Sequence, residues 1–445
     1  MSGLGRGNRR STVVAIAAAV TVSPAPLLIV HAGALGAAPL YTPRCERGGR
    51  GGGGDVPLCS SKRSSGASRL SSRTQSLQVA AAGGPVIKVA LSDDRWEAFV
   101  GAHPEGLVYH LPVWLKALAH EHECQHLCLG FQDSSGKLRG VLPLLATRGL
   151  PLSRSAIMGR RLSSLPRTPV SGPLAVDAEA AAALVRAAVD RVRANPGTRL
   201  ELKVGSPCCD GLEEGLVRVP WRSSYVLQLP ASPENLRFGN SRNHSRIEWA
   251  VRKAMGRGVR VRAAESQADL SSWYRLYLDT MRRQVVPPRP FRFFQALWNL
   301  MRPQGLVTLL LAEQTEGRKR SLLAGSVFLK FGRTVSYAFN GSRRDALHLR
   351  PNDIIQYEAI HDACRDGFQV YDLGEVAQGE MGLANFKSKW GAEEKTLYRY
   401  YYPPVQEAGE VATGSGFVRA AAEAAWRRLP LAWTAGLGGA LYRFM

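Results

Sequence analysis

Apolar and polar residues follow the periods of strands and helices from residue 85 to residue 403. Alternating or continuously apolar runs predict strands at Val86–Leu91, Gln125–Phe131, Leu138–Ala146, Leu200–Val204, Val259–Ala263, Leu306–Ala312, Leu322–Phe331, Thr334–Asn340 and Gln369–Leu373. Helical periods predict helices at Asp93–Val100, Pro112–His122, Ala178–Asn195, Ser266–Gln284, Pro290–Met301 and Asn352–Gly367. Since strands alternate with helices, we expect an α/β fold with mixed sheets.

Two of the predicted helices carry clear apolar stripes. The stripe of Ser266–Gln284 is Leu270, Trp273, Tyr274, Tyr277, Leu278 and Met281, and that of Asn352–Gly367 is Ile354, Tyr357, Ile360 and Cys364. Residues with this spacing lie on one face of a helix. We therefore expect both stripes in the hydrophobic core.

The same order of elements occurs twice along the chain. The first run starts at Val86 and the second near Gly258, and each contains a strand, helices, antiparallel strands, a helix and a strand. The duplication is inferred from this order alone, since no repeat is visible residue by residue. We expect domains at 85–235 and 259–403, a basic linker helix at 236–258, and a tail at 404–445 that contains an amphipathic helix.

Residues 1–84 differ in composition from the rest and form an expected disordered leader. The apolar runs Thr12–Val22 and Leu27–Leu40 are too short or too interrupted to span a bilayer. Ser60–Ala82 is rich in Ser and Arg and contains no acid, as in a plastid transit peptide. A signal-like run before such a segment predicts a bipartite plastid address, with the mitochondrion as the alternative destination and a low-complexity tail without a targeting role as the simpler interpretation.

The formal net charge is +22, and residues 1–85 carry ten Lys and Arg against two acids. A positive surplus attracts anionic partners, such as phosphate-bearing cofactors, RNA or an anionic membrane surface, but does not select among them. The seven cysteines are odd in number and have no regular spacing. We therefore expect reduced thiols and a mature protein that is not secreted.

The segment Gly332–Tyr402 carries four motifs in sequence. They are YAFNGSRRD (Tyr337–Asp345), RPNDIIQYEAI (Arg350–Ile360), YDLGE (Tyr371–Glu375) and NFKSKWG (Asn385–Gly391). In this order they resemble the FemAB-related and BioF-type acetyltransferase-like proteins of the GNAT superfamily. The resemblance implies two tandem GNAT-like domains and transfer of an acyl or aminoacyl group to an amine.

Motifs outside that segment extend the resemblance to residues 86–435. GVLPLL (Gly140–Leu145), LSSLPRTPVSGPL (Leu162–Leu174) and RIEWAVRKAMGRGVRV (Arg246–Val261) are similar to the first domain and linker helix of those proteins. WRRLPLAW (Trp426–Trp433) resembles the tail of the exosortase (PEP-CTERM)-associated members. Only the leader then lies outside the resemblance.

Lys387 is the expected catalytic residue. Attack of an amine on an ester or thioester places negative charge on the carbonyl oxygen, which a fixed cation can stabilise. The resemblance assigns this role to the lysine of the F-K motif, and Phe386 and Trp390 would bracket Lys387 with apolar bulk. The alternative is that Lys387 and Lys389 are surface lysines of a short helix.

Asn340, Arg343, Arg344 and Arg350 are expected to bind substrate. They precede a helix that starts at Pro351, and a helix N-terminus beside arginines suits a pyrophosphate or an RNA phosphate. The alternative is a solvated basic loop with a proline in the first helical turn. The chain lacks the Gln/Arg-x-x-Gly-x-Gly/Ala run that binds pyrophosphate in acetyl-CoA-dependent GNAT enzymes. The co-substrate therefore remains open between acyl-CoA and aminoacyl-tRNA, and no permanently bound cofactor is expected.

The predicted linker helix could contact a tRNA. Its cations include Arg252 and Lys253, which are the expected nucleic-acid-binding residues. The alternative is a solvated helix that only connects two domains.

Two acids and a His/Cys cluster are the remaining candidates for a catalytic or metal-binding role. Asp372 and Glu375 flank Gly374 at a strand end, where either could accept the proton of the attacking amine. Glu375, Phe386 and Trp390 are also expected to bind substrate, and capping of a turn is the alternative for the two acids. HEHECQHLC (His120–Cys128) fits no standard metal-site spacing, so no metal is expected.

Together these features predict an N-acyltransferase with an amine-bearing acceptor and a donor that is acyl-CoA or aminoacyl-tRNA. The alternative is a catalytically inactive GNAT-like module that binds RNA or an anionic membrane surface through the basic helix and the tail. The tail is not expected to span a membrane.

Overall fold

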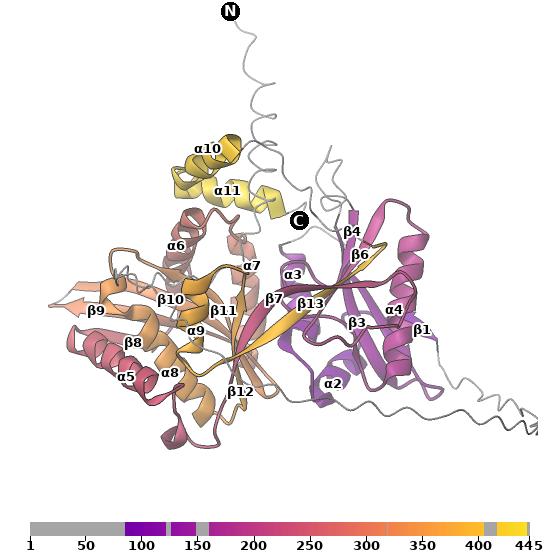
Figure 1. Cartoon of the computed structure of the whole chain (residues 1–445), viewed down its shortest axis with the longest axis horizontal. Helices are drawn as coiled ribbons and strands as arrows, with labels where there is room; N and C mark the ends of the chain where they lie inside the picture. Colours follow the sequence, from indigo (N-terminus) through magenta and orange to yellow (C-terminus); the bar gives the residue numbers. More distant parts are fainter. Residues whose placement is uncertain (1–84, 122–125, 148–159, 318, 405–415, 443–445) are drawn as a thin grey trace, which may run out of the picture. The chain divides into compact units, whose positions relative to one another are not determined.

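The computed structural model describes residues 85–121, 126–147, 160–317, 319–404 and 416–442 (Figure 1). The expected leader lies outside the described residues, as do residues 122–125 of the His/Cys cluster. The described strands form one 13-stranded sheet in the order β1-β2-β3-β4-β6-β13-β7-β12-β11-β10-β9-β8, with β5 paired to β3.

The N-terminal half runs from β1 to β7. Its strands are β1 (Val86–Lys88), β2 (His126–Gln132), β3 (Leu138–Thr147), β4 (Arg160–Ser163), β5 (Leu174–Ala175), β6 (Thr198–Val204) and β7 (Val217–Gln228). Its helices are α2 (Asp94–Ala102), η1 (Val108–His110), α3 (Pro112–Ala119) and α4 (Ala178–Arg193). The side chain of Asp177 accepts a hydrogen bond from the amide of Ala180 and so caps α4, which explains where that helix starts.

The C-terminal half runs from η3 to β13. Its strands are β8 (Val259–Ala263), β9 (Val307–Glu316), β10 (Lys319–Phe331), β11 (Thr334–Ser342), β12 (Val370–Val376) and β13 (Glu393–Tyr402). Its helices are η3 (Pro233–Asn235), α5 (Ser241–Gly256), α6 (Gln267–Arg283), α7 (Phe291–Ala296), η4 (Leu297–Met301), η5 (Arg302–Gln304), η6 (Leu347–Leu349), α8 (Pro351–Arg365) and α9 (Met381–Ser388). The helix predicted at Pro290–Met301 is thus two pieces, since η4 is a π-helical turn.

The two halves repeat one order of elements. β1, α2, α3, β2, β3, β4, α4 and β6 correspond to β8, α6, α7, β9, β10, β11, α8 and β12. Each half contains one parallel pair at the same place in that order, β4 with β6 and β11 with β12. The predicted duplication is therefore confirmed.

Strands β7 and β13 are exchanged between the halves. β7 follows β6 in the chain but pairs antiparallel with β12, while β13 follows α9 but pairs antiparallel with β6. The two also pair with each other and run side by side between the halves in Figure 1. The halves consequently share one mixed sheet instead of having a sheet each.

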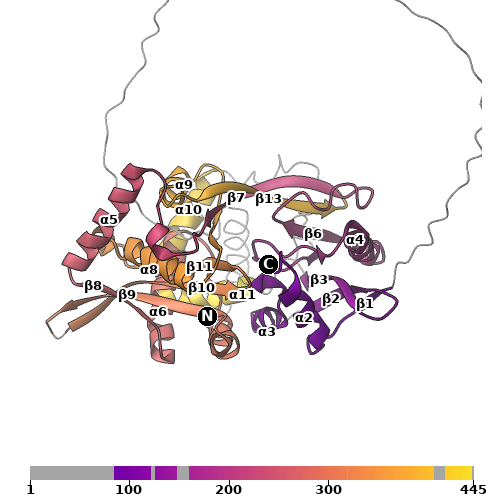
Figure 2. The same ribbon diagram turned by 90° about the horizontal axis from the view of Figure 1, so that it is seen from below.

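Helices cover both faces of this sheet. Figure 2 shows α4 on one side of the N-terminal strands and α2 and α3 on the other. In the C-terminal half, α5 and α8 pack on one face and α6 and α7 on the other, in separate clusters of buried residues. Both predicted apolar stripes lie where expected: that of α6 is fully buried, and in α8 only Tyr357 is half-buried.

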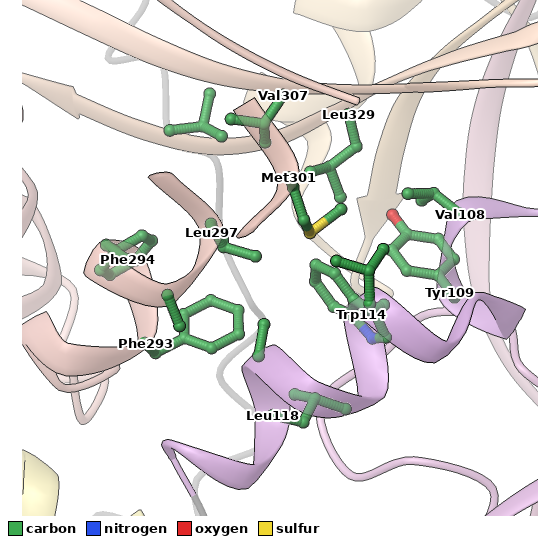
Figure 3. Close-up of a cluster of buried hydrophobic side chains, with 14 of the residues drawn as sticks. Val108, Tyr109, Trp114, Leu118, Phe293, Phe294, Leu297, Met301, Val307 and Leu329 are labelled. Atoms are coloured by element: carbon green, nitrogen blue, oxygen red, sulfur yellow. The ribbon is translucent and has the colours of Figure 1, made fainter. Parts of the chain in front are cut away.

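One hydrophobic cluster joins the two halves. Trp114 and Leu118 of α3 face Phe293 of α7 and Met301 of η4 in Figure 3. The rings of Trp114 and Phe293 meet edge to face with centroids 5.7 Å apart. Because this core is continuous, the halves pack as one unit at this point.

A buried ion pair also connects the halves. The guanidinium of Arg289, which precedes α7, pairs with the carboxylate of Glu121 after α3, and both side chains are almost fully buried. A second nitrogen of Arg289 donates to the carbonyl of Arg167 at 2.6 Å. Buried charges are costly unless they are paired, so this contact fixes α3 and the 162–172 segment against the C-terminal half.

The predicted linker helix is part of the C-terminal half. Helix α5 covers most of the expected range 236–258, and its residues Ile247, Ala250, Val251 and Ala254 are buried. Ile247 and Val251 belong to the same cluster as Ile354 and Ile360 of α8. The interpretation of this segment as a solvated connector is therefore wrong for one of its faces.

The expected amphipathic tail contains two helices, α10 (Gly416–Arg427) and α11 (Leu431–Tyr442). Both contact α6. In the described part of the chain, every helix is too short or too polar to cross a bilayer.

Candidate functional site

Lys387 is buried at the point where β11 and β12 separate. The parallel pairing of these strands ends at Ser336 and Asp372. Beyond it, the Nζ atom of Lys387 donates to the carbonyl oxygens of Gly374 at 2.8 Å and Glu375 at 3.0 Å. Helix α9 thus points its lysine at the edge of β12 that no longer pairs with β11, and the interpretation of Lys387 as a surface lysine is wrong.

Burial changes the acidity of this lysine. Desolvation lowers the pKa of Lys387 to about 7, and the nearby carboxylates of Asp372 and Glu375 oppose the shift. The bonds to two carbonyls require Nζ to donate, which favours the ammonium form. An ammonium has three donors, so one donor is left over after the two contacts made with described residues.

Asp372 and Glu375 have different surroundings. The carboxylate of Glu375 lies 3.3 Å from the guanidinium of Arg222 on β7, and both side chains are about nine-tenths buried. The carboxylate of Asp372 accepts from the hydroxyl of Ser224 at 2.6 Å and from the amide of Gly374 at 2.8 Å. Desolvation raises the pKa of Asp372, so Asp372 is the better proton acceptor of the two.

The N-terminal half contributes one residue to this region. Tyr109 of η1 is buried near Ser336 and the carboxylates of Asp372 and Glu375. Desolvation, reinforced by those carboxylates, raises its pKa. The phenol therefore stays neutral and is available as a hydrogen-bond donor or acceptor.

The two aromatic residues of the motif bracket a different lysine from the one expected. The Nζ atom of Lys389 lies 4.1 Å from the ring centroid of Phe386 and 5.4 Å from that of Trp390. Lys389 also pairs with Asp353 at the start of α8. Trp390 is fully buried against Phe238, with centroids 5.1 Å apart. Phe386 and Trp390 therefore fix α9 to α8 through Lys389.

The residues expected to bind substrate before α8 are only partly brought together. Arg350 immediately precedes Pro351, the first residue of α8, and has a left-handed backbone with φ of 61°. Arg343 pairs with Asp345 near the surface, and Arg344 is exposed. Arg350 thus stands at the helix N-terminus, whereas Arg343 and Arg344 lie at the end of β11.

Asn340 is a buried residue of β11. Its Oδ1 atom accepts from the hydroxyl of Ser326 at 3.1 Å, and its Nδ2 atom is buried without a hydrogen-bond partner among the described residues. The adjacent Gly341 has a packing role, because a Cβ there would lie 2.5 Å from the backbone nitrogen of Tyr277. The glycine of the motif therefore lets α6 approach β11 closely.

The expected nucleic-acid-binding residues lie on the outer side of α5. Arg252 is exposed, and the Nζ atom of Lys253 lies 4.8 Å from the ring centroid of Trp249. Trp249 itself is 51% exposed. This helix thus presents a basic and aromatic outer face.

A second group of buried charges was not expected from the sequence. Lys203 on β6 is buried and donates to the carbonyl of Leu165 at 2.8 Å. Desolvation lowers its pKa to about 7, against the opposing effect of Glu201. The signal was present as the alternation of charged and apolar residues in RLELKV (Arg199–Val204), which predicts one polar strand face but not its burial.

The described residues contain no group of three or more His, Cys, Asp or Glu side chains that could hold a metal ion.

The sequence of residues 240–388 matches the family described as Acetyltransferase (GNAT) domain. The match starts at α5 and ends just after Lys387, so it contains Lys387, Asp372 and Glu375 but not Tyr109, Arg222 and Ser224. It also includes the helix that the sequence suggested as a separate linker.

Two further comparisons found similar proteins. A UDP-N-acetylmuramoylpentapeptide-lysine N(6)-alanyltransferase of Weissella viridescens is 27% identical over 158 residues, which are 35% of this chain and 44% of that relative. The chain therefore matches less than half the length of this relative. The crystal structure of FemX superposes with a TM-score of 0.56 at 17% identity, over 72% of this chain and 97% of that chain.

A tandem GNAT protein from the clavulanic acid biosynthesis pathway is a more remote structural neighbour. It has a TM-score of 0.43 at 10% identity, over 72% of this chain and 99% of that chain.

These findings confirm the resemblance to FemAB-related GNAT proteins. The superposition on FemX and the repeated element order confirm the expected tandem GNAT-like fold. The similarity of the tail to exosortase-associated proteins stays a prediction.

Proposed function

We propose that this protein is an N-acyltransferase that moves an acyl or aminoacyl group from an activated donor to an amine. The proposal depends on one observation above all: a buried lysine of the GNAT domain keeps one N–H donor after binding two carbonyls of β12. The alanyltransferase named above, to which this chain is similar, supports an aminoacyl group and an amine acceptor. The donor would be acyl-CoA or aminoacyl-tRNA.

In the proposed reaction the amine nitrogen attacks the carbonyl carbon of the donor, and the carbonyl electron pair moves to oxygen. The remaining N–H of Lys387 would stabilise that oxygen, which requires the ammonium form. Asp372 would accept the proton that the amine loses. The intermediate then reforms its carbonyl and expels a thiolate from a thioester or a ribose alkoxide from an aminoacyl ester, and the leaving sulfur or oxygen takes up the proton that Asp372 received from the amine.

Further groups would position the reactants. The end of the β11–β12 pairing, beside Tyr109, is the expected place of the reacting carbonyl. Arg350 at the N-terminus of the 15-residue helix α8 could bind a phosphate of either donor. Both donors carry phosphates, so this contact does not distinguish them.

The proposal is tested by measuring whether the full chain transfers the acyl or aminoacyl group from each donor to an amine. Carbon-labelled acetyl-CoA and alanyl-tRNA are incubated separately with the protein and a panel of polyamines, amino sugars and lysine-containing peptides. We expect acceptor-dependent labelling with one donor and its loss in Lys387→Met. Transfer by Lys387→Met at the wild-type rate would remove this lysine from the mechanism.

A second candidate function has a specific observation in its favour. Trp249 is 51% exposed beside Lys253, and Arg350 lies 5.8 Å from the same ring centroid. An exposed aromatic ring among cations suits an inactive module that binds RNA. Salt-dependent RNA binding without transfer from either donor would favour this function.

We also propose that residues 1–84 direct the protein to a plastid, with the mitochondrion as the alternative. The Ser- and Arg-rich, acid-free segment Ser60–Ala82 supports this proposal. Fusion of residues 1–84 to a fluorescent protein, followed by microscopy, tests it. Fluorescence that stays in the cytosol would contradict it.

A further inference from the structure

Two neighbouring cysteines, Cys208 and Cys209, lie in the segment that connects β6 to the exchanged strand β7. We call them the cysteine pair, and neither takes part in the proposed transfer reaction. Cys208 is exposed, whereas Cys209 is buried in the same hydrophobic cluster as Leu202 and Tyr400. The pair thus consists of one accessible sulfur and one protected sulfur.

The local fold brings the two sulfur atoms together. The amide of Cys208 donates to the carbonyl of Ser206 at 2.8 Å, which closes a three-residue turn around Pro207. In a strand, the side chains of consecutive residues point to opposite faces. After this turn the Sγ atoms of Cys208 and Cys209 instead lie 3.8 Å apart, so that one thiol can donate to the other.

This contact makes the two thiols unequal. The thiol of Cys209 can donate to a thiolate at Cys208, and this contact lowers the pKa of Cys208. The same contact, together with burial, raises the pKa of Cys209. Because the thiolate is the reactive form, Cys208 is the first nucleophile of the pair. Once the sulfur of Cys208 is bonded to another sulfur, the largest cause of the raised pKa of Cys209 is removed.

The residue after the cysteine pair fixes it to both exchanged strands. The carboxylate of Asp210 accepts from the hydroxyl of Tyr400 on β13 at 2.6 Å and pairs with Arg218 on β7. These contacts limit the motion of the turn relative to an unfolded chain. The two sulfurs are therefore held near each other by the fold, and not only by their adjacency in the sequence.

We propose that the cysteine pair is a reversible oxidation site, at which a low-molecular-weight disulfide such as oxidised glutathione converts the two thiols into one disulfide ring. Consecutive Cα atoms are about 3.8 Å apart, below the usual range of about 4.4–6.8 Å for disulfides, so the bond would be strained and easily reduced. The cysteines of this chain lack a framework spacing, which fits a transient disulfide rather than a structural one. This inference goes beyond the proposed function and does not depend on it.

The oxidation takes place in two exchange steps. The thiolate of Cys208 attacks one sulfur of oxidised glutathione, forms a mixed disulfide and expels one glutathione thiolate. The thiol of Cys209 then loses its proton and attacks Sγ of Cys208, which expels the second glutathione thiolate. The protons of the two cysteines end on the two glutathione thiolates. Two protein thiols are thus oxidised to one disulfide while one glutathione disulfide is reduced to two thiols.

Peptide mapping of the full chain tests this site. Trypsin releases residues 204–218 as one peptide, which contains Cys208 and Cys209 and no other cysteine. The protein is incubated with a rising ratio of oxidised to reduced glutathione, and free thiols are then blocked with iodoacetamide. The wild-type peptide should take up no iodoacetamide and be lighter than the dithiol by two hydrogen atoms. This form should appear more than about tenfold faster than in a synthetic peptide of residues 204–218, and excess reduced glutathione should restore the dithiol.

Three matched variants assign the roles of the two sulfurs. Cys209→Ala should stop at the mixed disulfide and carry glutathione on Cys208. Cys208→Ala should stay unmodified, because Cys209 is buried. Cys364→Ala removes a buried thiol that donates to the carbonyl of Pro230 outside this segment, and it should form the ring like the wild type. Thermal unfolding of each variant shows whether it is folded.

Three results would overturn the proposal. The wild type could keep both thiols in buffers that oxidise the synthetic peptide, or it could form the ring no faster than that peptide. It could also carry glutathione as stably as Cys209→Ala, in which case no ring forms. Transfer to an amine is not measured in this experiment, so none of these results bears on the proposed function.

Discussion

The two halves of the sheet separate their parallel strands at equivalent places but close the gap differently. In the N-terminal half, beyond Ser163 and Glu201, the amide of Ser164 donates to the carbonyl of Glu201 at 2.8 Å, and that of Ser171 donates to the carbonyl of Lys203 at 3.0 Å. The backbone amides of the 164–171 segment thus satisfy the hydrogen-bonding carbonyls of β6. In the C-terminal half the corresponding carbonyls of β12 are satisfied by the side chain of Lys387.

Each half therefore has a buried lysine where its parallel strands separate. The contacts of the two lysines differ, and this difference indicates which of the two places suits catalysis. Both have a pKa lowered to about 7 by desolvation. Lys203 donates to Leu165 within a segment that fills its own gap, whereas Lys387 reaches an edge from a separate helix. The proposed chemistry therefore belongs to the second gap, where a lysine with a remaining N–H donor stands in place of a backbone segment.

Exchange of the two lysines for methionine is the strongest test of this difference. Lys387→Met should lower transfer about 10²–10³-fold, the loss typical of one oxyanion donor. Lys203→Met should lower it less than about tenfold, because the lysine it removes contacts Leu165 and not the reacting group. Initial rates with the active donor measure both, and thermal unfolding shows that the variants are folded. A larger loss in Lys203→Met than in Lys387→Met would reverse the assignment of the two gaps.

The stability of the protein should depend on pH through the same two lysines. Each has a folded pKa of about 7, below its ordinary value of 10.5. Between these values the unfolded chain binds more protons than the folded one, so stability rises with pH by about 1.4 kcal/mol per pH unit for each lysine.

Urea unfolding from pH 7 to pH 10 measures this slope. Each methionine variant should lose about half of the lysine contribution, and the double variant should lose all of it. A slope that is the same in the wild type and in the double variant would mean that neither lysine is desolvated in the folded protein.

Much of the fold could be predicted because local patterns and tertiary packing agree. The stripes of α6 and α8 and the runs that became β3 and β10 are apolar where the core needs them. β13 was missed because EEKTLYRYYY (Glu393–Tyr402) begins with four polar residues, and β7 was missed because VRVPWRSSYVLQ (Val217–Gln228) contains a proline and several polar residues. The pairing of these strands comes from exchange between halves, which no local pattern encodes.

The candidate site was predictable only where a motif marked it. Lys387 stood in the F-K motif, but its carbonyl partners depend on the separation of β11 from β12, and Phe386 and Trp390 proved to bracket Lys389. The charges on β4, β6 and β13 come from strands that are distant in sequence. In the sequence they look like solvated residues of polar strand faces, and only the register shows that Arg161 lies opposite Arg199 and Arg399 opposite Lys203.

Glycine substitutions can disturb the gap between β4 and β6, which the 164–172 segment fills, without changing the gap at Lys387. A Cβ at Gly172 would lie 2.4 Å from a methyl of Val204 and 3.1 Å from the carbonyl of Lys203. Gly172→Ala should therefore lower the free energy of unfolding by about 1–3 kcal/mol, as other overpacked sites do. Gly382→Ala in α9 meets nothing within 4 Å and should be neutral or stabilise by up to about 1 kcal/mol. Urea unfolding compares the two, and equal effects would mean that the 164–172 segment does not press against β6.

The smallest expected effect tests whether the rings of Phe386 and Trp390 stabilise Lys389 or Lys387. Phe386→Leu keeps most of the apolar volume but removes the ring 4.1 Å from Nζ of Lys389, which should cost about 0.5–1 kcal/mol of stability. Lys387 binds carbonyls of β12 through separate contacts. The transfer rate of Phe386→Leu should therefore fall less than about fivefold, which is far smaller than the loss expected in Lys387→Met. Urea unfolding and initial rates on the same samples measure both quantities. A rate loss near 10²-fold with unchanged stability would show that Phe386 acts on Lys387 or on the substrate, because a single ring cannot alter catalysis that strongly through Lys389 alone.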